Sequence, residues 1–324
     1  MNVSPLVTIA IPTYNRAASY LPQALQSALR QTYANLDIVV SDNCSTDHTR
    51  AFVTNIDDPR LRYFRHGSNI GQKGNYSFCF ERARGNYVLL LHDDDTIDDD
   101  FVCSCMEAAG GASDIGIIRT GVRLINADGK VIGEITNEVM GLPIDAFFRV
   151  WFSSKTPIYC CNTLFNTEAL RAIGGLKSKH FCYPDTMAIF ELAAQHGRVD
   201  IPEVKASFRI HGEEFGFSRR IADWCEDSLE LLHCMSDLVP EGSRNQVLKE
   251  GARFFARANY HRASTASSPW ERAVALMKVM RYFNYRQLPS FNLVLHVFYG
   301  TYIYNAMRFI KRRAIRPFQR LATD

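Results

Sequence analysis

Short apolar runs and helical apolar patterns alternate along the first third of the chain. Runs rich in β-branched residues are typical of buried strands, and apolar residues that recur every three or four positions are typical of helices. This pattern predicts strands at residues 6–11, 36–42, 61–65 and 86–93, with helices at residues 19–31, 45–56 and 75–85 between them. Strands that alternate with helices in this way indicate βαβ units and a parallel sheet.

The pattern changes twice after this region. The predicted elements are then a helix at residues 101–110, a β-hairpin at residues 115–134, a strand and short helix at residues 159–176, a helix at residues 183–197 and a strand at residues 198–212. Further along, only helical patterns remain. We therefore expect an α/β domain over residues 1–217 and a helical region over residues 218–324.

Unusual polar residues follow several of the predicted strands. Residues 13–16 come directly after the first strand, Asp42 ends the second, and Asp93, Asp94 and Asp95 end the fourth. The carboxyl ends of parallel strands meet at one edge of a sheet, and ligands bind at that edge. We expect these side chains to lie close together there.

Three consecutive acids at a strand end need an explanation, because like charges this close destabilise one another. Either the acids form a solvated turn or a cation lies among them. Gathered carboxylates favour a hard divalent ion such as Mg²⁺ or Mn²⁺. The second triplet, residues 98–100, precedes the helix at residues 101–110, so we expect it to cap that helix.

Composition narrows the class of protein. The chain has 324 residues, 47% of them hydrophobic, and a net charge of +3, which gives no support to a nucleic-acid partner. The first residues do not resemble a signal peptide, and nine cysteines without such a signal indicate reduced thiols. No apolar run is long enough for a membrane span. These features predict a cytoplasmic protein.

The last stretch of the chain is basic. Residues 307–320 interleave arginine and lysine with apolar residues and contain no acid. A basic amphipathic helix can contact an anionic membrane surface or pack on its own domain. We favour peripheral contact with the inner face of the cell membrane.

Four motifs together carry a resemblance to a known family. The sequences VTIAIPTYNR, IVVSDNCSTDHT, NIGQKGN and GNYVLLLHDDD, in this order and spacing, resemble the family 2 nucleotide-sugar glycosyltransferases of the GT-A fold. The resemblance is strong over about the first 110 residues and weaker to about residue 215. It implies a Rossmann-like, mostly parallel sheet flanked by helices.

The resemblance also implies roles for residues. The nucleotide-sugar would contact Pro12, Thr13, Tyr14, Arg16, Asp42, Asn69, Lys73, Asp93 and Asp94. A divalent ion, Mn²⁺ or Mg²⁺, would bind Asp95 most directly, together with His211. Three alternatives stay open: Asp42 as a turn residue, Lys73 as a surface lysine and His211 as a surface histidine.

An inverting transferase needs a general base to take the proton of the acceptor hydroxyl. The resemblance places it at the start of a helix in the second half, which maps onto Asp185 in the sequence YPDTMAIF. A simple helix cap is the alternative interpretation of Asp185, and it would lower the pKa. Glu191, about two turns along the same helix, is the second candidate base.

The resulting expectation is an inverting transferase that moves a sugar from a nucleoside diphosphate to a glycan hydroxyl. The resemblance implies a lipid-linked glycan of a bacterial surface polysaccharide as the acceptor, and we take UDP as the default nucleotide. One alternative is a sugar nucleotidyltransferase, although IPTYNRAAS is not its glycine-rich loop. Another is an inactive, membrane-bound scaffold. An aspartate-nucleophile phosphatase fits less well, because Thr96 comes one residue early.

Overall fold

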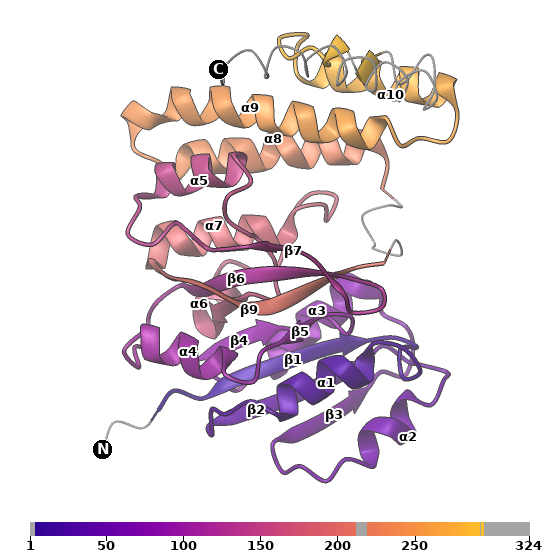
Figure 1. The fold of residues 1–324 in the computed structure, drawn as a ribbon, viewed down its shortest axis with the longest axis vertical. Coiled ribbons are helices and arrows are strands. Elements are labelled where there is room, and N and C mark those ends of the chain that lie inside the picture. The colour runs from indigo at the N-terminus through magenta and orange to yellow at the C-terminus, as the bar shows by residue number, and fades with distance from the viewer. Residues whose placement is uncertain (1–3, 212–218, 292, 295–324) are drawn as a thin grey trace, which may run out of the picture.

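The structure is a computed structural model that describes residues 4–211, 219–291 and 293–294 (Figure 1). The basic stretch at residues 307–320 lies outside the described residues, so its predicted membrane contact stays a prediction. Within the described residues, no helix combines the length and the apolar character that crossing a bilayer requires.

The described strands form one sheet in the order β3-β2-β1-β4-β8-β6-β9-β5, and β7 pairs with β6. Their bounds are β1 Val7–Thr13, β2 Leu36–Asp42, β3 Leu61–Arg65, β4 Tyr87–Leu90, β5 Thr96–Ile97, β6 Ile117–Asn126, β7 Val131–Ile135, β8 Thr163–Asn166 and β9 Arg198–Ile210. The parallel strands predicted in the first third are confirmed, as is the β6–β7 hairpin.

The register of the parallel strands explains why polar residues meet at one edge. Thr13 at the end of β1 lies opposite Asp42 at the end of β2. In the neighbouring pair, Ala10 lies opposite Leu90, the last residue of β4, so the acids that follow β4 emerge beside the end of β1. The sheet becomes mixed beyond β4, because β8 runs antiparallel to both β4 and β6.

Helices cover both faces of the sheet (Figure 1). Their bounds are α1 Leu21–Leu29, α2 Thr49–Thr54, α3 Gly71–Arg82, α4 Phe101–Ala108, α5 Ile144–Phe152, α6 Thr167–Ala172 and α7 Pro184–His196. Apolar residues of α1, α2 and α4 form one core with one face of the sheet, whereas those of α3, α5, α6 and α7 belong to a second core. The expected α/β fold with flanking helices is confirmed.

In the part of the chain that the structure describes, three helices follow β9, and they confirm the expected helical region as far as that part extends. They are α8 Ile221–Asp237, α9 Glu241–Ala263 and α10 Pro269–Tyr282, and they stack above α5 and α7 (Figure 1). Buried residues of α8 and α9, such as Leu231 and Phe255, belong to the same core as Phe190 of α7. The division into two domains at residue 217 stays a prediction.

The second acidic triplet has a structural role that differs from the expected one. Asp100 is the cap residue of α4, yet its side chain makes no capping hydrogen bond. The acids instead form ion pairs with three basic residues: Asp98 with Arg123, Asp99 with Arg30 and Asp100 with Lys205. The prediction of helix caps at residues 98–100 is therefore wrong, because nearby cations from other elements compete successfully for the carboxylates.

Candidate active site

A cleft of about 480 Å³ lies at the edge where the parallel strands end, and we call it the rim cleft. Among its lining residues are seven that the sequence indicated: Pro12, Thr13, Tyr14, Arg16, Asn69, Asp93 and Asp94. Sequence reasoning missed Tyr76, His92 and Arg209, which also line it. His92 directly precedes the three acids in the sequence, and this position could have indicated it as a site residue.

Asp42 and Lys73 are not among the residues that line the rim cleft. Asp42 is fully buried; one of its oxygens accepts a hydrogen bond from the backbone N–H of Ser45 at 2.7 Å, and the other accepts one from the hydroxyl of Tyr63. Asp42 therefore fixes the loop after β2, as the turn alternative expects. Lys73 is exposed on α3. Their roles toward a ligand stay predictions.

The loops around the cleft are connected by side-chain hydrogen bonds. Asn43, which follows Asp42, donates to the Asn69 side chain at 3.0 Å and accepts from the backbone N–H of Ile70 at 2.8 Å. Asn75 of α3 bonds to both the side chain and the backbone of Ser41 in β2. These contacts orient the start of α3 against the strand ends and give the cleft a defined wall.

The three consecutive acids occupy different environments. The hydroxyl of Thr13 donates to Asp93 at 2.7 Å, and burial together with the Asp94 carboxylate raises the pKa of Asp93 to about 7. Asp94 lines the cleft, with one oxygen 2.9 Å from Nε2 of His211. Asp95 is buried, and one of its oxygens accepts the backbone N–H of Arg209 at 2.9 Å.

The residues present fit a divalent cation. The second oxygen of Asp95 is buried and has no hydrogen-bond partner, and it lies 3.8 Å from Nδ1 of His92. One ligand atom each from His92, Asp94 and Asp95 lie within 4.8 Å of one another. Burial raises the pKa of Asp95, because an ionised carboxylate is unfavourable there without a counter-charge. Oxygen and imidazole donors suit Mn²⁺, and oxygen donors suit Mg²⁺.

A second pocket, also of about 480 Å³, adjoins the rim cleft. The two cavities share the side chains of Gln72, Tyr76, His92 and Phe208. The rings of Tyr76 and His92 are stacked, with centroids 5.2 Å apart. This stacked pair therefore lies between the two cavities. Molecules bound in the two cavities would be neighbours on either side of the pair.

Asp185 lines the second pocket from the first turn of α7. Its carboxylate accepts the backbone N–H of Thr186 at 2.8 Å, but burial outweighs this bond and raises the pKa of Asp185. A raised pKa makes the carboxylate a better proton acceptor near neutral pH. Glu191, further along α7, is not among the residues that line this pocket.

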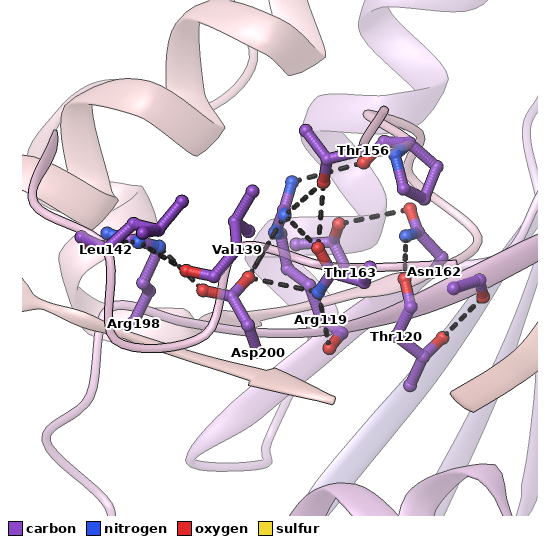
Figure 2. Close-up of polar contacts among 12 residues, drawn as sticks. Arg119, Thr120, Val139, Leu142, Thr156, Asn162, Thr163, Arg198 and Asp200 are labelled. Carbon is purple, nitrogen blue, oxygen red and sulfur yellow. Dashed lines mark hydrogen bonds and ion pairs between the residues drawn. The ribbon is translucent and has the colours of Figure 1, made fainter. Parts of the chain in front are cut away.

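A buried polar network around Arg119 includes two residues of the wall of the second pocket. Figure 2 shows the hydrogen bonds and ion pairs of this network. The guanidinium of Arg119 is fully buried and lies 3.0 Å from Asp200, which also accepts from Arg198 at 2.6 Å. Arg119 further donates to the hydroxyl of Thr156 and to the carbonyl of Pro157, two residues of the pocket wall. The network thus links β6 and β9 to the loop that precedes β8.

Comparison with protein families gives the class that this fold and site define. The model of the family described as "Glycosyl transferase family 2" matches residues 8–174, which is more than half of the chain. The chain belongs to this family. The matched range contains every predicted site residue except Asp185 and His211.

Curated relatives are similar over part of their length. They include the putative colanic acid biosynthesis glycosyl transferase WcaA of Escherichia coli (34% identity over 29% of this chain and 34% of the relative). The succinoglycan biosynthesis protein ExoO of Rhizobium meliloti is 33% identical over 39% of this chain and 36% of its own. A GalNAc(5)-diNAcBac-PP-undecaprenol beta-1,3-glucosyltransferase of Campylobacter jejuni is 35% identical over 29% and 31%. The matched stretch spans about a third of these relatives.

Solved structures share the fold over most of the chain. Residues 1–349 of TarS from S. aureus, in complex with UDP, align with a TM-score of 0.59 at 13% identity, over 92% of each chain. The mannosyltransferase PcManGT from Pyrobaculum calidifontis, in complex with GDP-Man and Mn²⁺, aligns with a TM-score of 0.58 at 18% identity, over 99% of this chain and 84% of its own. At these identities the likeness concerns the fold.

Proposed function

We propose that this protein is an inverting glycosyltransferase that moves a sugar from a nucleoside diphosphate to a hydroxyl of a glycan. The observation that carries the proposal is the contact between the two cavities. Two carboxylates, Asp93 and Asp94, line the rim cleft, and a third, Asp185, lines the second pocket. The two cavities meet at Tyr76 and His92, which supports the proposal that a donor and an acceptor bind side by side.

The rim cleft is proposed to bind the donor. The side chains of Thr13, Tyr14, Arg16 and Asn69 would surround the nucleotide, and Pro12 would shape the floor beneath it. Asp42 would act through the loop that it fixes, and Lys73 would reach the diphosphate from the exposed side of α3. UDP remains the default nucleotide; the solved relatives contain UDP in TarS and GDP-Man in PcManGT.

We expect the metal ion to bind where the acids after β4 come together at the rim cleft. Asp94 and Asp95 would bind the ion together with His92, and the orphaned oxygen of Asp95 supports this set. His211, whose Nε2 lies 2.9 Å from Asp94, would join them through that carboxylate. Asp94 would face the diphosphate, because it lines the cleft whereas Asp95 does not. When bound, a divalent cation stabilises the charge that develops on a departing diphosphate.

Asp185 is proposed as the general base. The acceptor hydroxyl would enter the second pocket and lose its proton to the Asp185 carboxylate as its oxygen attacks the anomeric carbon. The bond from that carbon to the diphosphate oxygen breaks on the opposite side of the sugar, so the configuration inverts. The raised pKa of Asp185 favours this proton transfer. Arg119 and Asp200 would keep the pocket wall in place.

The acceptor is proposed to be a glycan of a bacterial surface polysaccharide, carried on a lipid at the inner face of the cell membrane. The names of the curated relatives support this, since they concern colanic acid, succinoglycan and an undecaprenol-linked glycan. The protein would then work in the cytoplasm, in peripheral contact with the membrane.

Thermal stabilisation by nucleotides tests the proposal, because a ligand that binds the folded protein and not the unfolded chain raises the melting temperature. UDP, GDP, CDP and dTDP are each added with and without Mn²⁺. We expect one nucleotide to raise the melting temperature, more strongly with Mn²⁺, and Asp94→Asn to remove the metal-dependent part. No shift with any nucleotide would instead support the inactive scaffold.

A further inference from the structure

A third cavity, of about 1020 Å³, adjoins the second pocket, and we call it the basic groove. It is formed by the end of β9, the start of α8, the end of α9 and the first half of α10. The basic groove and the second pocket share Phe208, Arg219, Trp224 and Arg262. A molecule with its reacting hydroxyl at Asp185 can therefore continue into the groove.

The described lining of the groove is strongly positive. Its charged and titratable members are Arg219, Arg220, His261, Arg262 and Lys278, against the single acid Glu271. That acid is already engaged, because its side chain accepts the backbone N–H of Ser268 in the capping box of α10. Arg220 pairs with Asp223 at 2.7 Å, and Arg262 and Lys278 contribute two further positive charges to the lining. An anionic ligand fits this surface.

Arg262 lies where the groove meets the second pocket. Its guanidinium carbon is 3.9 Å from the ring centroid of Trp224, and one of its nitrogens donates to the side chain of Asn259 at 3.1 Å. Stacking on an aromatic ring and this hydrogen bond together fix the guanidinium plane. A fixed guanidinium is well suited to phosphate oxygens, which it can bind in a bidentate manner.

Apolar side chains also line the groove. Ile221, Val274 and Ala275 contribute to it, together with the indole of Trp270, which is 74% exposed. A large exposed aromatic side chain beside other apolar residues favours a binding surface. Cations and apolar side chains in one groove match an amphipathic anion.

We propose that the basic groove binds the carrier end of the acceptor, a phosphate or diphosphate ester of a long hydrocarbon alcohol. The phosphates would contact Arg219 and Arg262, and the hydrocarbon would lie along Trp270 and Val274. This inference rests on the proposed function, because it extends the acceptor outward from Asp185. Residues 307–320 of the same chain are an unsuitable occupant, since they carry basic residues and no acid.

Calorimetric titration with farnesyl diphosphate tests the inference. The rim cleft is first saturated with the nucleotide that binds best and Mn²⁺, so that the diphosphate cannot bind there. We expect farnesyl diphosphate to bind at least about tenfold more tightly than inorganic pyrophosphate or farnesol, since each of these lacks one of the two contacts. Arg262→Gln and Trp270→Ala should each weaken it, Arg262→Gln by about tenfold.

Met277→Ala is the matched control. Met277 is exposed on α10 like Trp270, but it does not line the groove, so its substitution should change the dissociation constant by less than about twofold. Equal affinity of wild type, Arg262→Gln and Trp270→Ala would overturn the inference. The inference would also be overturned if both variants lost binding to phosphatidylglycerol vesicles to the same extent. The groove would then be a membrane contact instead.

The two proposals fail in different ways. If nucleotide binds with Mn²⁺ but farnesyl diphosphate does not, the donor site stands and the carrier site is wrong. If no nucleotide binds at all, the proposed function itself is wrong. Unchanged nucleotide affinity in Arg262→Gln and Trp270→Ala shows that both variants are folded.

Discussion

The buried pair of Arg119 and Asp200 offers a sharp test of how the second pocket is supported. Asp200→Asn keeps the shape of the side chain but removes its charge, so the guanidinium of Arg119 stays fully buried without a carboxylate. Breaking a buried ion pair by neutralising one partner costs about 3–5 kcal/mol. The carbonyl of Pro157 and the side chains of Asn137 and Thr156 still accept from Arg119, so we expect the lower end of this range.

The assay is urea unfolding at neutral pH, followed by circular dichroism, with Asp99→Asn as control. Asp99 pairs with Arg30 at a similar distance of 3.1 Å, but both side chains are more than half exposed, so that pair contributes only about 0–1 kcal/mol. We expect a loss of about 3 kcal/mol in Asp200→Asn and almost none in Asp99→Asn. Equal losses in the two variants would refute the reasoning.

Two further predictions concern packing and pH. Gly251 of α9 lies so close to the Leu232 side chain that Gly251→Ala should destabilise the protein by about 1–3 kcal/mol. Gly242 lies in open space on the same helix, so Gly242→Ala should leave stability unchanged or slightly raised. Thermal unfolding of the two variants measures both effects. A rise in the melting temperature of Gly251→Ala would contradict this account of the α8–α9 contact. Burial raises the pKa of Asp185, so its carboxylate takes up a proton at a higher pH than an exposed aspartate does. Because only the ionised carboxylate can act as the base, we expect kcat/KM for transfer to fall as the pH is lowered through that pKa. A value of kcat/KM that stays constant on the acid side would argue against Asp185 as the base.

Much of the rim cleft could be predicted because parallel strands impose simple geometry. Thr13 and Asp42 face each other in the register, and the acids after β4 emerge beside them. The different directions in which the three consecutive acids point were not predictable. It depends on the tight turn in which the backbone N–H of Asp95 bonds to the carbonyl of His92 at 3.1 Å, which directs Asp95 inward and Asp94 to the cleft.

The second half of the chain was harder to predict. The antiparallel insertion of β8 between β4 and β6 is a long-range pairing that local patterns do not reveal. The helix α5, which forms part of the core shared with α9, was not anticipated either. Without these contacts the buried position of Arg119 could not be inferred, because an arginine on a predicted strand is ordinarily expected to face solvent.

The central claim is that donor binding and proton abstraction belong to two adjoining cavities. The Asp185→Asn variant tests it most directly, by comparing the affinity for the nucleotide-sugar in the presence of Mn²⁺ with the rate of sugar transfer. We expect an unchanged dissociation constant and a transfer rate lower by about 10²-fold or more. Transfer at the wild-type rate, or loss of nucleotide binding in a folded variant, would contradict it.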